Sequence, residues 1–475
     1  MVFSSSLFLL YFLPVFLLFY HIADKKYKNA VILFASLLFY AWGAPKFVFV
    51  VVGSVILDFY IIQKMHHCRK IILRKYLLTL SISINIGLLL YFKYANFFVE
   101  NLDAVLSSFG FGNLSWTSVV LPIGISFYTF QTLTYSIDVY RKIHAPLKSP
   151  FQYLVYIMLF PQMIAGPIVR FNQIADQIED REHLETLDNK MLGFFRFAIG
   201  LAKKVLIANV LGAEADQAFA LSQGELSTAT AWVGVLAYTF QIYYDFSGYS
   251  DMAIGLGRIM GFTFPENFNN PYISRNITEF WRRWHITLGS WMRDYLYIPL
   301  GGSRVKSKSR LYFNLWFIFL FSGLWHGAAW NFVLWGAYHG FFLILDRLFF
   351  LKFSEKIGKL PSIAITFFIT IIGWVLFRAE TLHQASYYIQ AMFSFNNFEI
   401  KHFTLDFWMM LIIGIVFAFI TLSSFGRKWE QIVFFSESYS LKGNYLMTAV
   451  YIVLIVLSIS SITTSDFNPF IYFRF

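Results

Sequence analysis

The sequence predicts an all-helical protein that crosses a membrane many times. Hydrophobic residues make up 57% of its 475 residues and charged residues only 14%, whereas soluble domains carry about 25% charged residues. Stretches of about 20 apolar residues, the length that spans a bilayer core, recur along the chain. These stretches lack the alternating pattern of membrane β-strands, so helices are expected to satisfy the backbone in lipid.

The apolar stretches predict about 11 to 13 membrane helices, some of them re-entrant. The first stretch has its lysines after the apolar run, whereas a cleavable signal has them before it, so we expect a retained first span. A further candidate, 192–213, contains Lys203 and Lys204. The other ranges are 1–20, 29–45, 46–63, 76–92, 116–137, 149–169, 226–244, 311–345, 361–377, 407–425 and 443–465.

Loop charges predict the orientation of these helices. The segments 21–28, 64–75 and 141–148 are basic, whereas 213–225 carries acids and no base. Because lysine and arginine collect in cytoplasmic loops, we expect the basic segments inside and the N-terminus outside. The net charge of +11 then indicates contact with anionic membrane lipid, and no nucleic-acid partner is expected. The single cysteine, Cys68, excludes an internal disulfide and a cysteine metal cluster.

We expect one membrane domain over 1–475, divided into three segments. Residues 1–263 form the N-terminal helices and residues 311–475 the C-terminal ones, with a polar interruption at 264–310. This middle segment holds eight basic and three acidic residues among tryptophans and tyrosines. That mixture is typical of amphipathic helices at a cytoplasmic membrane interface.

The uncharged run 311–345 contains the leading candidate for chemistry, His326. One straight helix of this length would measure about 52 Å, too long for a single span. The run is expected to break at Ser322–Gly327, where glycines permit non-helical backbone. Irregular backbone at membrane depth normally lines a cavity, and an ionisable residue there is a functional candidate by default. The alternative is a packed histidine that is hydrogen-bonded to a neighbouring helix.

Two other histidines lie in apolar or aromatic surroundings. His339 would be about 20 Å from His326 on one continuous helix and on another face, so packing is the favoured interpretation. His285 follows Arg282 and Arg283 in an aromatic sequence. That sequence is compatible with a snorkelling surface helix or with a site for an anionic donor, since arginine suits phosphate recognition.

Other motifs are weaker. Gly255-Leu256-Gly257 lacks a preceding strand and is no dinucleotide loop. Asp245, Ser247 and Asp251 could form a triad with a histidine, but a nucleophile elbow needs a strand-to-helix turn. No histidine–carboxylate spacing indicates a metal site. Gln162 and Arg170 flank a broken apolar element, whose polar backbone would form a cavity wall.

Three sequence blocks resemble the membrane-bound O-acyltransferases. They are most similar to the branch that contains the membrane subunits of alginate, peptidoglycan and exopolysaccharide O-acetyltransferases. The blocks are FPQMIAGPIVR from residue 160, NFNNPYISRNITEFWRRWHITLGSWMRDYLYIPLGG from 267 and FSGLWHGAAWNFVLWGAYHG from 321; the C-terminal PFIYFRF is also similar.

The resemblance implies a funnel of membrane helices with a central tunnel, in the inner (cytoplasmic) membrane of a bacterium. It implies that His326 is the catalytic histidine and that His285 occupies a second family position. It further implies acyl transfer from a cytoplasmic thioester, acetyl-CoA or an acyl carrier, toward an acceptor outside, with no bound cofactor. A periplasmic acetyltransferase would complete transfer to the glycan. The residues expected to contact substrate or donor are Arg282, Arg283, Trp325, Asn331, Gln162 and Arg170.

The chemistry of imidazole is compatible with this role. A neutral His326 could take the proton of an attacking hydroxyl, and burial disfavours its charged form. His285 or the nearby arginines would orient the donor. Three alternatives remain at this point: D-alanyl transfer to teichoic acid, a transporter without chemistry of its own, and a scaffold for the periplasmic partner. The glycan, the donor and the formation of an acyl-enzyme are left open.

Overall fold

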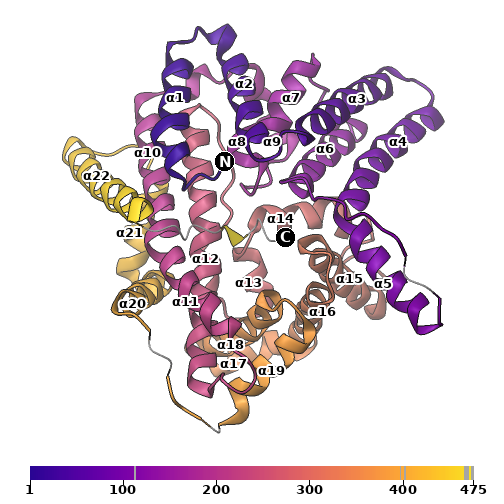
Figure 1. Cartoon of the computed structure of the whole chain (residues 1–475). Coiled ribbons are helices and arrows are strands. Elements are labelled where there is room, and N and C mark those ends of the chain that lie inside the picture. The colour runs from indigo at the N-terminus through magenta and orange to yellow at the C-terminus, as the bar shows by residue number, and fades with distance from the viewer. Residues whose placement is uncertain (112–113, 396, 401–402, 465–469, 472–475) are drawn as a thin grey trace. The chain divides into compact units, whose positions relative to one another are not determined.

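The computed structural model describes residues 1–111, 114–395, 397–400, 403–464 and 470–471. Within these residues all regular structure is helical and no β-strand occurs (Figure 1). The chain divides into two compact units, one of residues 1–186 and 257–264, the other of 187–256 and 265–475. These boundaries differ from the three segments expected above, and the single membrane domain stays a prediction.

The first unit consists of helices joined by short loops. Its elements are η1 (Phe8–Phe12), α1 (Leu13–Ile22), α2 (Lys25–Gly43), α3 (Phe47–His67), α4 (Ile71–Leu89), η2 (Leu90–Tyr94), α5 (Ala95–Ser108), α6 (Ile125–Tyr140), α7 (Pro150–Met158), α8 (Phe160–Met163), α9 (Phe171–Glu179) and η3 (Glu182–Leu184).

A buried carboxylate connects four helices of the first unit. Asp58 of α3 is 1% exposed and accepts hydrogen bonds from Ser81 and Asn85 of α4 and from Tyr153 of α7, whose hydroxyl lies 2.8 Å away. Ser136 of α6 also donates to this carboxylate. Because a buried carboxylate is costly unless it is hydrogen-bonded, this network fixes how α3, α4, α6 and α7 pack.

The second unit contains the segments expected to carry the chemistry. Its elements are α10 (Leu187–Ala202), η4 (Lys203–Ala208), α11 (Asn209–Ala220), α12 (Thr228–Ile259, which ends in the first unit), η5 (Pro271–Ile273), α13 (Ile277–Arg283), α14 (Ile286–Met292), η6 (Arg293–Tyr297), α15 (Lys308–His326), α16 (Trp330–Leu345), η7 (Asp346–Phe350), α17 (Leu351–Ile357), α18 (Lys359–Arg378), α19 (Leu382–Ser394), α20 (Leu405–Phe419), η8 (Ile420–Leu422), α21 (Ser424–Phe435) and α22 (Leu441–Thr464).

A charged network joins α10 to α12 inside the second unit. Arg196 of α10 lies 2.7 Å from Asp251 of α12 and 2.6 Å from Glu266, which follows α12. Lys203 lies 2.7 Å from the second carboxylate oxygen of Asp251. These opposite charges are largely shielded from solvent, so each one depends on its partners for solvation.

Six helical segments of the described residues are long and apolar enough to cross a membrane. They are Phe47–His67, Ile71–Ser108, Trp330–Ile357, Lys359–Arg378, Leu405–Leu422 and Leu441–Thr464. The sequence predicted more spans because it counted every apolar stretch. Several of those stretches form helices that are shorter, such as α1, or that continue into polar sequence, such as α12.

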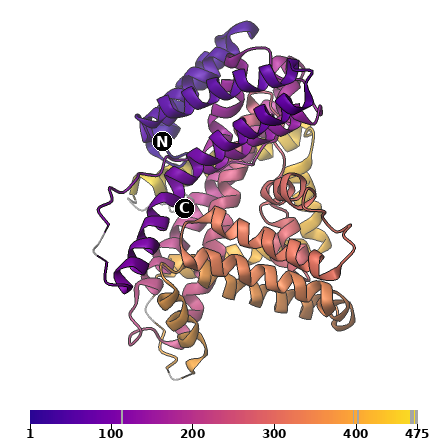
Figure 2. The same ribbon diagram turned by 90° about the vertical axis from the view of Figure 1, so that its right-hand side faces the viewer.

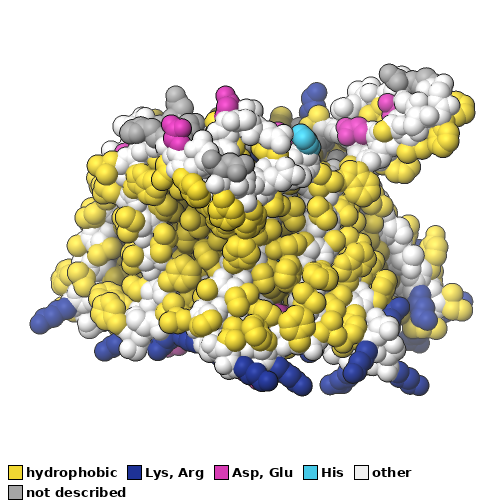
Figure 3. Space-filling view, turned by 90° about the horizontal axis from the view of Figure 1, so that it is seen from below, with side chains coloured by type: hydrophobic (Ala, Val, Ile, Leu, Met, Phe, Trp, Pro, Cys, Tyr) yellow, Lys and Arg dark blue, Asp and Glu magenta, His cyan; other side chains and the backbone are white. Residues whose placement is uncertain are grey.

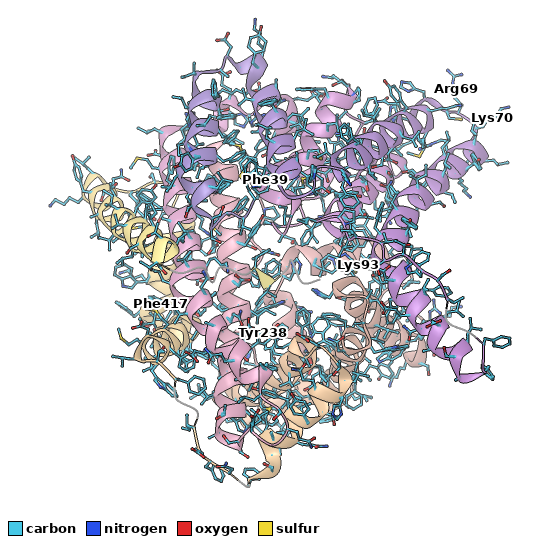
Figure 4. All side chains as sticks on the ribbon, in the orientation of Figure 1. Phe39, Arg69, Lys70, Lys93, Tyr238 and Phe417 are labelled. Carbon is cyan, nitrogen blue, oxygen red and sulfur yellow. The ribbon has the colours of Figure 1, made fainter. Side chains whose placement is uncertain are left out.

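Side-chain distribution agrees with a membrane protein. On the face seen in Figure 3, hydrophobic side chains cover a broad band, and lysine and arginine side chains lie along one edge. Within the first unit, Arg69 and Lys70 extend outward from the turn between α3 and α4, whereas Phe39 is buried (Figure 4). Six apolar helices and this distribution establish a multi-pass membrane protein.

Candidate functional site

The run 311–345 is broken at the end of the predicted segment: Ser322–His326 stay helical, and the helical structure is interrupted only from Gly327 to Ala329. Helix α15 ends at His326, where the amide of Gly327 donates to the carbonyl of Gly323 at 3.3 Å. The backbone at Gly327 is extended, and α16 begins at Trp330. The two helices fold back side by side as a hairpin (Figure 2). His326 therefore lies at the C-terminal end of α15, where helical regularity ends.

Two glycines allow α15 and α16 to approach so closely that their backbones are in contact. A Cβ atom on Gly323 would lie 2.3 Å from the carbonyl oxygen of Phe332, and one on Gly336 would lie 2.4 Å from that of Phe319. Neither carbonyl can move aside like the end of a flexible side chain. The close packing of the hairpin, which positions His326, therefore requires glycine at both positions.

Adding a single methyl group at Gly323 should measurably destabilise the protein. Overpacking of this kind costs about 1–3 kcal/mol, so the Gly323→Ala protein in detergent should melt at a lower temperature than the wild type. Gly53 of α3 provides a matched control, because nothing lies within 4 Å of a Cβ placed there. Gly53→Ala should retain or raise the melting temperature. Equal melting temperatures of the Gly323→Ala protein and the wild type would show that α15 and α16 can move apart without loss of stability.

Aromatic rings surround the His326 imidazole. The ring centroids of Trp325, Trp335 and Phe377 lie 4.9, 5.1 and 5.3 Å from its own, with interplanar angles of 71°, 85° and 77°. Phe377 belongs to α18, so three helices contribute to this environment. The side chain is only 4% exposed. These contacts hold the orientation of the ring and exclude most of the solvent from it.

His339 lies closer to the same cluster than a continuous helix would allow. The ring of Trp335 is 5.1 Å from His326 and also 5.1 Å from His339. The hairpin thus places both histidines against one tryptophan, whereas the sequence estimate assumed an unbroken helix. Neither ring nitrogen of His339 has a hydrogen-bond partner among the described residues. Its contacts with Trp281 and Trp335 agree with the packing role expected for it.

His285 is buried and does not belong to a snorkelling surface helix. It is 2% exposed and lies between α13 and α14 in a left-handed backbone conformation, with φ of 46°. Its ring lies 4.7 Å from that of Phe246 and 6.2 Å from that of Trp325. Burial lowers the pKa of His285 to about 3, so the imidazole is neutral at physiological pH.

Trp325 connects the two leading histidines of the site. The centroid of its ring lies 4.9 Å from that of His326, the next residue on α15, and 6.2 Å from that of His285. The sequence separates these histidines by 41 positions, and the fold brings them to one indole. Trp325 is 3% exposed. Trp325 therefore lies next to both histidines in the interior of the second unit.

The other predicted residues of the second unit differ in their surroundings. Arg282 is exposed, whereas Arg283 is bound by Glu279 at 2.9 Å and by the backbone carbonyl of Asn269 at 3.1 Å. Asn331 is buried, and its amide donates to the carbonyl of Ala379 at 2.7 Å. Arg282 is thus open to a ligand, while Arg283 and Asn331 already bind the protein.

Gln162 and Arg170 belong to the first unit. Gln162 is fully buried and donates to the carbonyl of Tyr156 at 2.6 Å. Arg170 precedes α9, where the side chain of Gln173 accepts from its backbone amide at 3.1 Å. The chain around them breaks into α7, α8 and an irregular stretch up to α9, as the sequence predicted. Their part in the site stays a prediction.

Sequence reasoning missed three residues of the site. Trp335 and Phe377 complete the aromatic surroundings of His326, and Asn267 contacts the ring of His285. Aromatic residues are so frequent in this chain that no spacing in the sequence distinguished Trp335 and Phe377 from the others. Among the described residues no group of three or more histidine, cysteine, aspartate or glutamate side chains could hold a metal ion.

Comparison with known proteins identifies the family. A model of the membrane-bound O-acyltransferase family matches residues 141–377, which include both leading histidines. The probable alginate O-acetylase AlgI of Pseudomonas putida is 42% identical over 100% of both chains. The chain belongs to the membrane-bound O-acyltransferase family. It is therefore an O-acyltransferase, and its activity requires an acyl donor substrate.

Other relatives of this O-acyltransferase differ in the acceptor that they are named for. A peptidoglycan O-acetyltransferase of Helicobacter pylori is 37% identical and covers 85% of this chain and 81% of its own. A teichoic acid D-alanyltransferase of Bacillus subtilis is 30% identical, covering 55% of this chain and 69% of its own. The relatives are thus named for different acyl groups and different polymers.

Proposed function

We propose that this O-acyltransferase acetylates an exported polysaccharide, similar to alginate or peptidoglycan, at the inner membrane of a bacterium. The acetyl group moves from a cytoplasmic thioester, acetyl-CoA or an acyl carrier, toward the outer face, where the N-terminus lies. The observation that carries this proposal is His326, buried among aromatic rings at the broken end of α15 within the region that the family model matches.

His326 is proposed as the general base. An acceptor hydroxyl attacks the thioester carbonyl, and the imidazole takes its proton as the new C–O bond forms. The C–S bond then breaks, and the imidazolium gives its proton to the leaving thiolate. The products are an acetyl ester and a free thiol, so no oxidant or reductant is needed. The surrounding aromatic rings exclude water, which would otherwise compete with the acceptor hydroxyl.

The donor is proposed to bind beside His285. The neutral imidazole of His285 and the exposed guanidinium of Arg282 lie on the α13–α14 segment. Beyond Arg293, which pairs with Asp294, four more exposed bases follow on the same basic segment, and each can attract the phosphates of a thioester donor. These bases are Arg304, Lys306, Lys308 and Arg310. Trp325 then lies between the donor side at His285 and the base at His326.

A periplasmic acetyltransferase is proposed as the partner that receives the acetyl group and completes transfer to the glycan. The names of the relatives support this proposal, because they are named for the O-acetylation of alginate and of peptidoglycan. D-Alanyl transfer to teichoic acid is the second candidate, favoured by the D-alanyltransferase relative. That relative covers about half of this chain, whereas the acetylase relatives cover most or all of it.

The proposal is tested by chemical analysis of surface polysaccharides from cells with and without this protein. Mild base releases both ester-linked acetate and ester-linked D-alanine, and mass spectrometry distinguishes them. We expect acetate in the polysaccharide of cells that contain the protein and its loss from cells that lack it. Loss of D-alanine instead would favour the second candidate, and unchanged ester content would exclude both.

A further inference from the structure

We propose that Asn267 is a positioning residue that fixes the proton of His285 on Nδ1, so that Nε2 is its proton-accepting nitrogen. The hydrogen bonds around Asn267 carry this inference, and its consequence for catalysis rests on the proposed function. Asn267 follows α12 and is fully buried. It lies next to His285 in space although 18 positions separate them in the sequence.

The orientation of the Asn267 amide follows from its neighbours. Its Oδ1 accepts from the backbone N–H of Thr287 at 3.3 Å and from the hydroxyl of the same residue at 2.8 Å. A backbone N–H can only donate, so the oxygen must face Thr287. The amide nitrogen then faces Ser250 of α12, to whose hydroxyl it donates at 3.1 Å. The opposite orientation would place two donors against each other.

The same oxygen determines which tautomer His285 adopts. Nδ1 of His285 lies 3.0 Å from Oδ1 of Asn267, and this oxygen has no hydrogen to donate. Nδ1 must therefore carry the proton and donate it. A neutral imidazole has one N–H, and the burial that lowers the pKa of His285 to about 3 keeps the ring neutral. Nε2 consequently bears the lone pair that can accept a proton or a hydrogen bond.

The backbone of Asn267 strengthens this arrangement. Its carbonyl accepts from the amide of Ile286 at 2.9 Å, so the residue binds both the His285 ring and the backbone directly after it. Phe246 of α12 and Trp325 of α15 pack against that ring, and its burial lowers its pKa. An amide suits this site, because an aspartate would place a negative charge beside the imidazole and favour its charged form.

The tautomer is measurable by NMR on the full-length protein labelled with ¹⁵N-histidine, in detergent. The His285 signal is identified as the one that a His285→Gln variant lacks. We expect the wild-type ring to be neutral with the proton on Nδ1. In Asn267→Leu the acceptor is absent, and a signal from the Nε2–H tautomer should appear. Asn314→Leu, which removes another buried asparagine amide of the same unit, should leave the His285 signal unchanged.

A second variant keeps the inference testable if Asn267→Leu does not fold. Asn267→Asp retains an acceptor for Nδ1 but adds a charge, so His285 should become protonated at a higher pH than in the wild type. That shift would show that the side chain at position 267 faces the His285 ring. A wild-type ring protonated on Nε2, or an unchanged titration in Asn267→Asp, would overturn the inference.

Failure of the proposed function remains distinguishable from failure of this inference. The NMR measurement needs no turnover, so it reports on Asn267 whether or not the polysaccharide is acetylated. Cells that carry Asn267→Leu or Asn267→Asp should show reduced polysaccharide acetate at equal protein level. Normal acetate in both variants would overturn the catalytic consequence, whereas absence of acetate with the wild type would contradict the proposed function itself.

Discussion

Replacing His326 with alanine should abolish acetylation of the surface polysaccharide while the protein still accumulates in the membrane. General base catalysis contributes about 10²–10⁴-fold to a rate, and the neighbouring rings of Trp325, Trp335 and Phe377 carry no base that could replace the imidazole. We expect acetate release by mild base to fall by at least about 100-fold. The amount of protein is measured in parallel by immunoblotting of membranes.

His339 provides the control for this variant. It is equally buried in the same helix hairpin and contacts the same Trp335, but packing is the role proposed for it. His339→Leu should retain polysaccharide acetate at a level that follows the amount of folded protein. If His339→Leu lost acetate while His326→Ala kept it, the roles assigned to the two histidines would be reversed.

Neutralising Asp251 should produce the largest loss of stability. Asp251 lies 2.7 Å from both Arg196 and Lys203, and its own side chain is 6% exposed. Removing one member of a buried ion pair costs about 3–5 kcal/mol, because it leaves an uncompensated charge. The Asp251→Asn protein should therefore melt well below the wild type in detergent, and its amount in membranes should fall.

An exposed ion pair of the same unit provides the matched comparison. Arg293 and Asp294 lie 2.7 Å apart, but the arginine side chain is 60% exposed. Pairs of that kind contribute about 0–1 kcal/mol, so Asp294→Asn should melt near the wild-type temperature. Equal melting temperatures for the Asp251→Asn and Asp294→Asn proteins would show that the charges between α10 and α12 are solvated by other means.

Much of the fold was predictable from the sequence because a bilayer restricts the alternatives. The scarcity of charge and the recurring apolar stretches predicted helices, and every apolar range contains helical residues. That the run 311–345 must break was predictable from its length, since 35 uncharged residues exceed one span, and its glycines indicated where. The division of the chain into two compact units was not predictable. Residues 257–264 belong to the first unit although the sequence on both sides belongs to the second, and no change of composition marks this segment.

The candidate site was predictable only in part. His326 stood out because an ionisable residue at a helix break is rare in an uncharged stretch. The spatial relation between His326, Trp335 and His339 depends on the hairpin, and an estimate along one helix could not provide it. Asn267 was also missed, since its role depends on hydrogen bonds to Ser250, His285 and Thr287. Such contacts between distant positions leave no periodic pattern in one sequence.

The most direct test of the account follows a labelled acetyl group to its product. The purified protein and the proposed periplasmic acetyltransferase are incubated with ¹⁴C-acetyl-CoA, or with a ¹⁴C-acetyl carrier protein, and the polysaccharide acceptor. We expect base-labile label in the polysaccharide with the wild type and with His339→Leu, and none with His326→Ala. Full labelling by His326→Ala would contradict the central claim that His326 is the base of the acyl transfer.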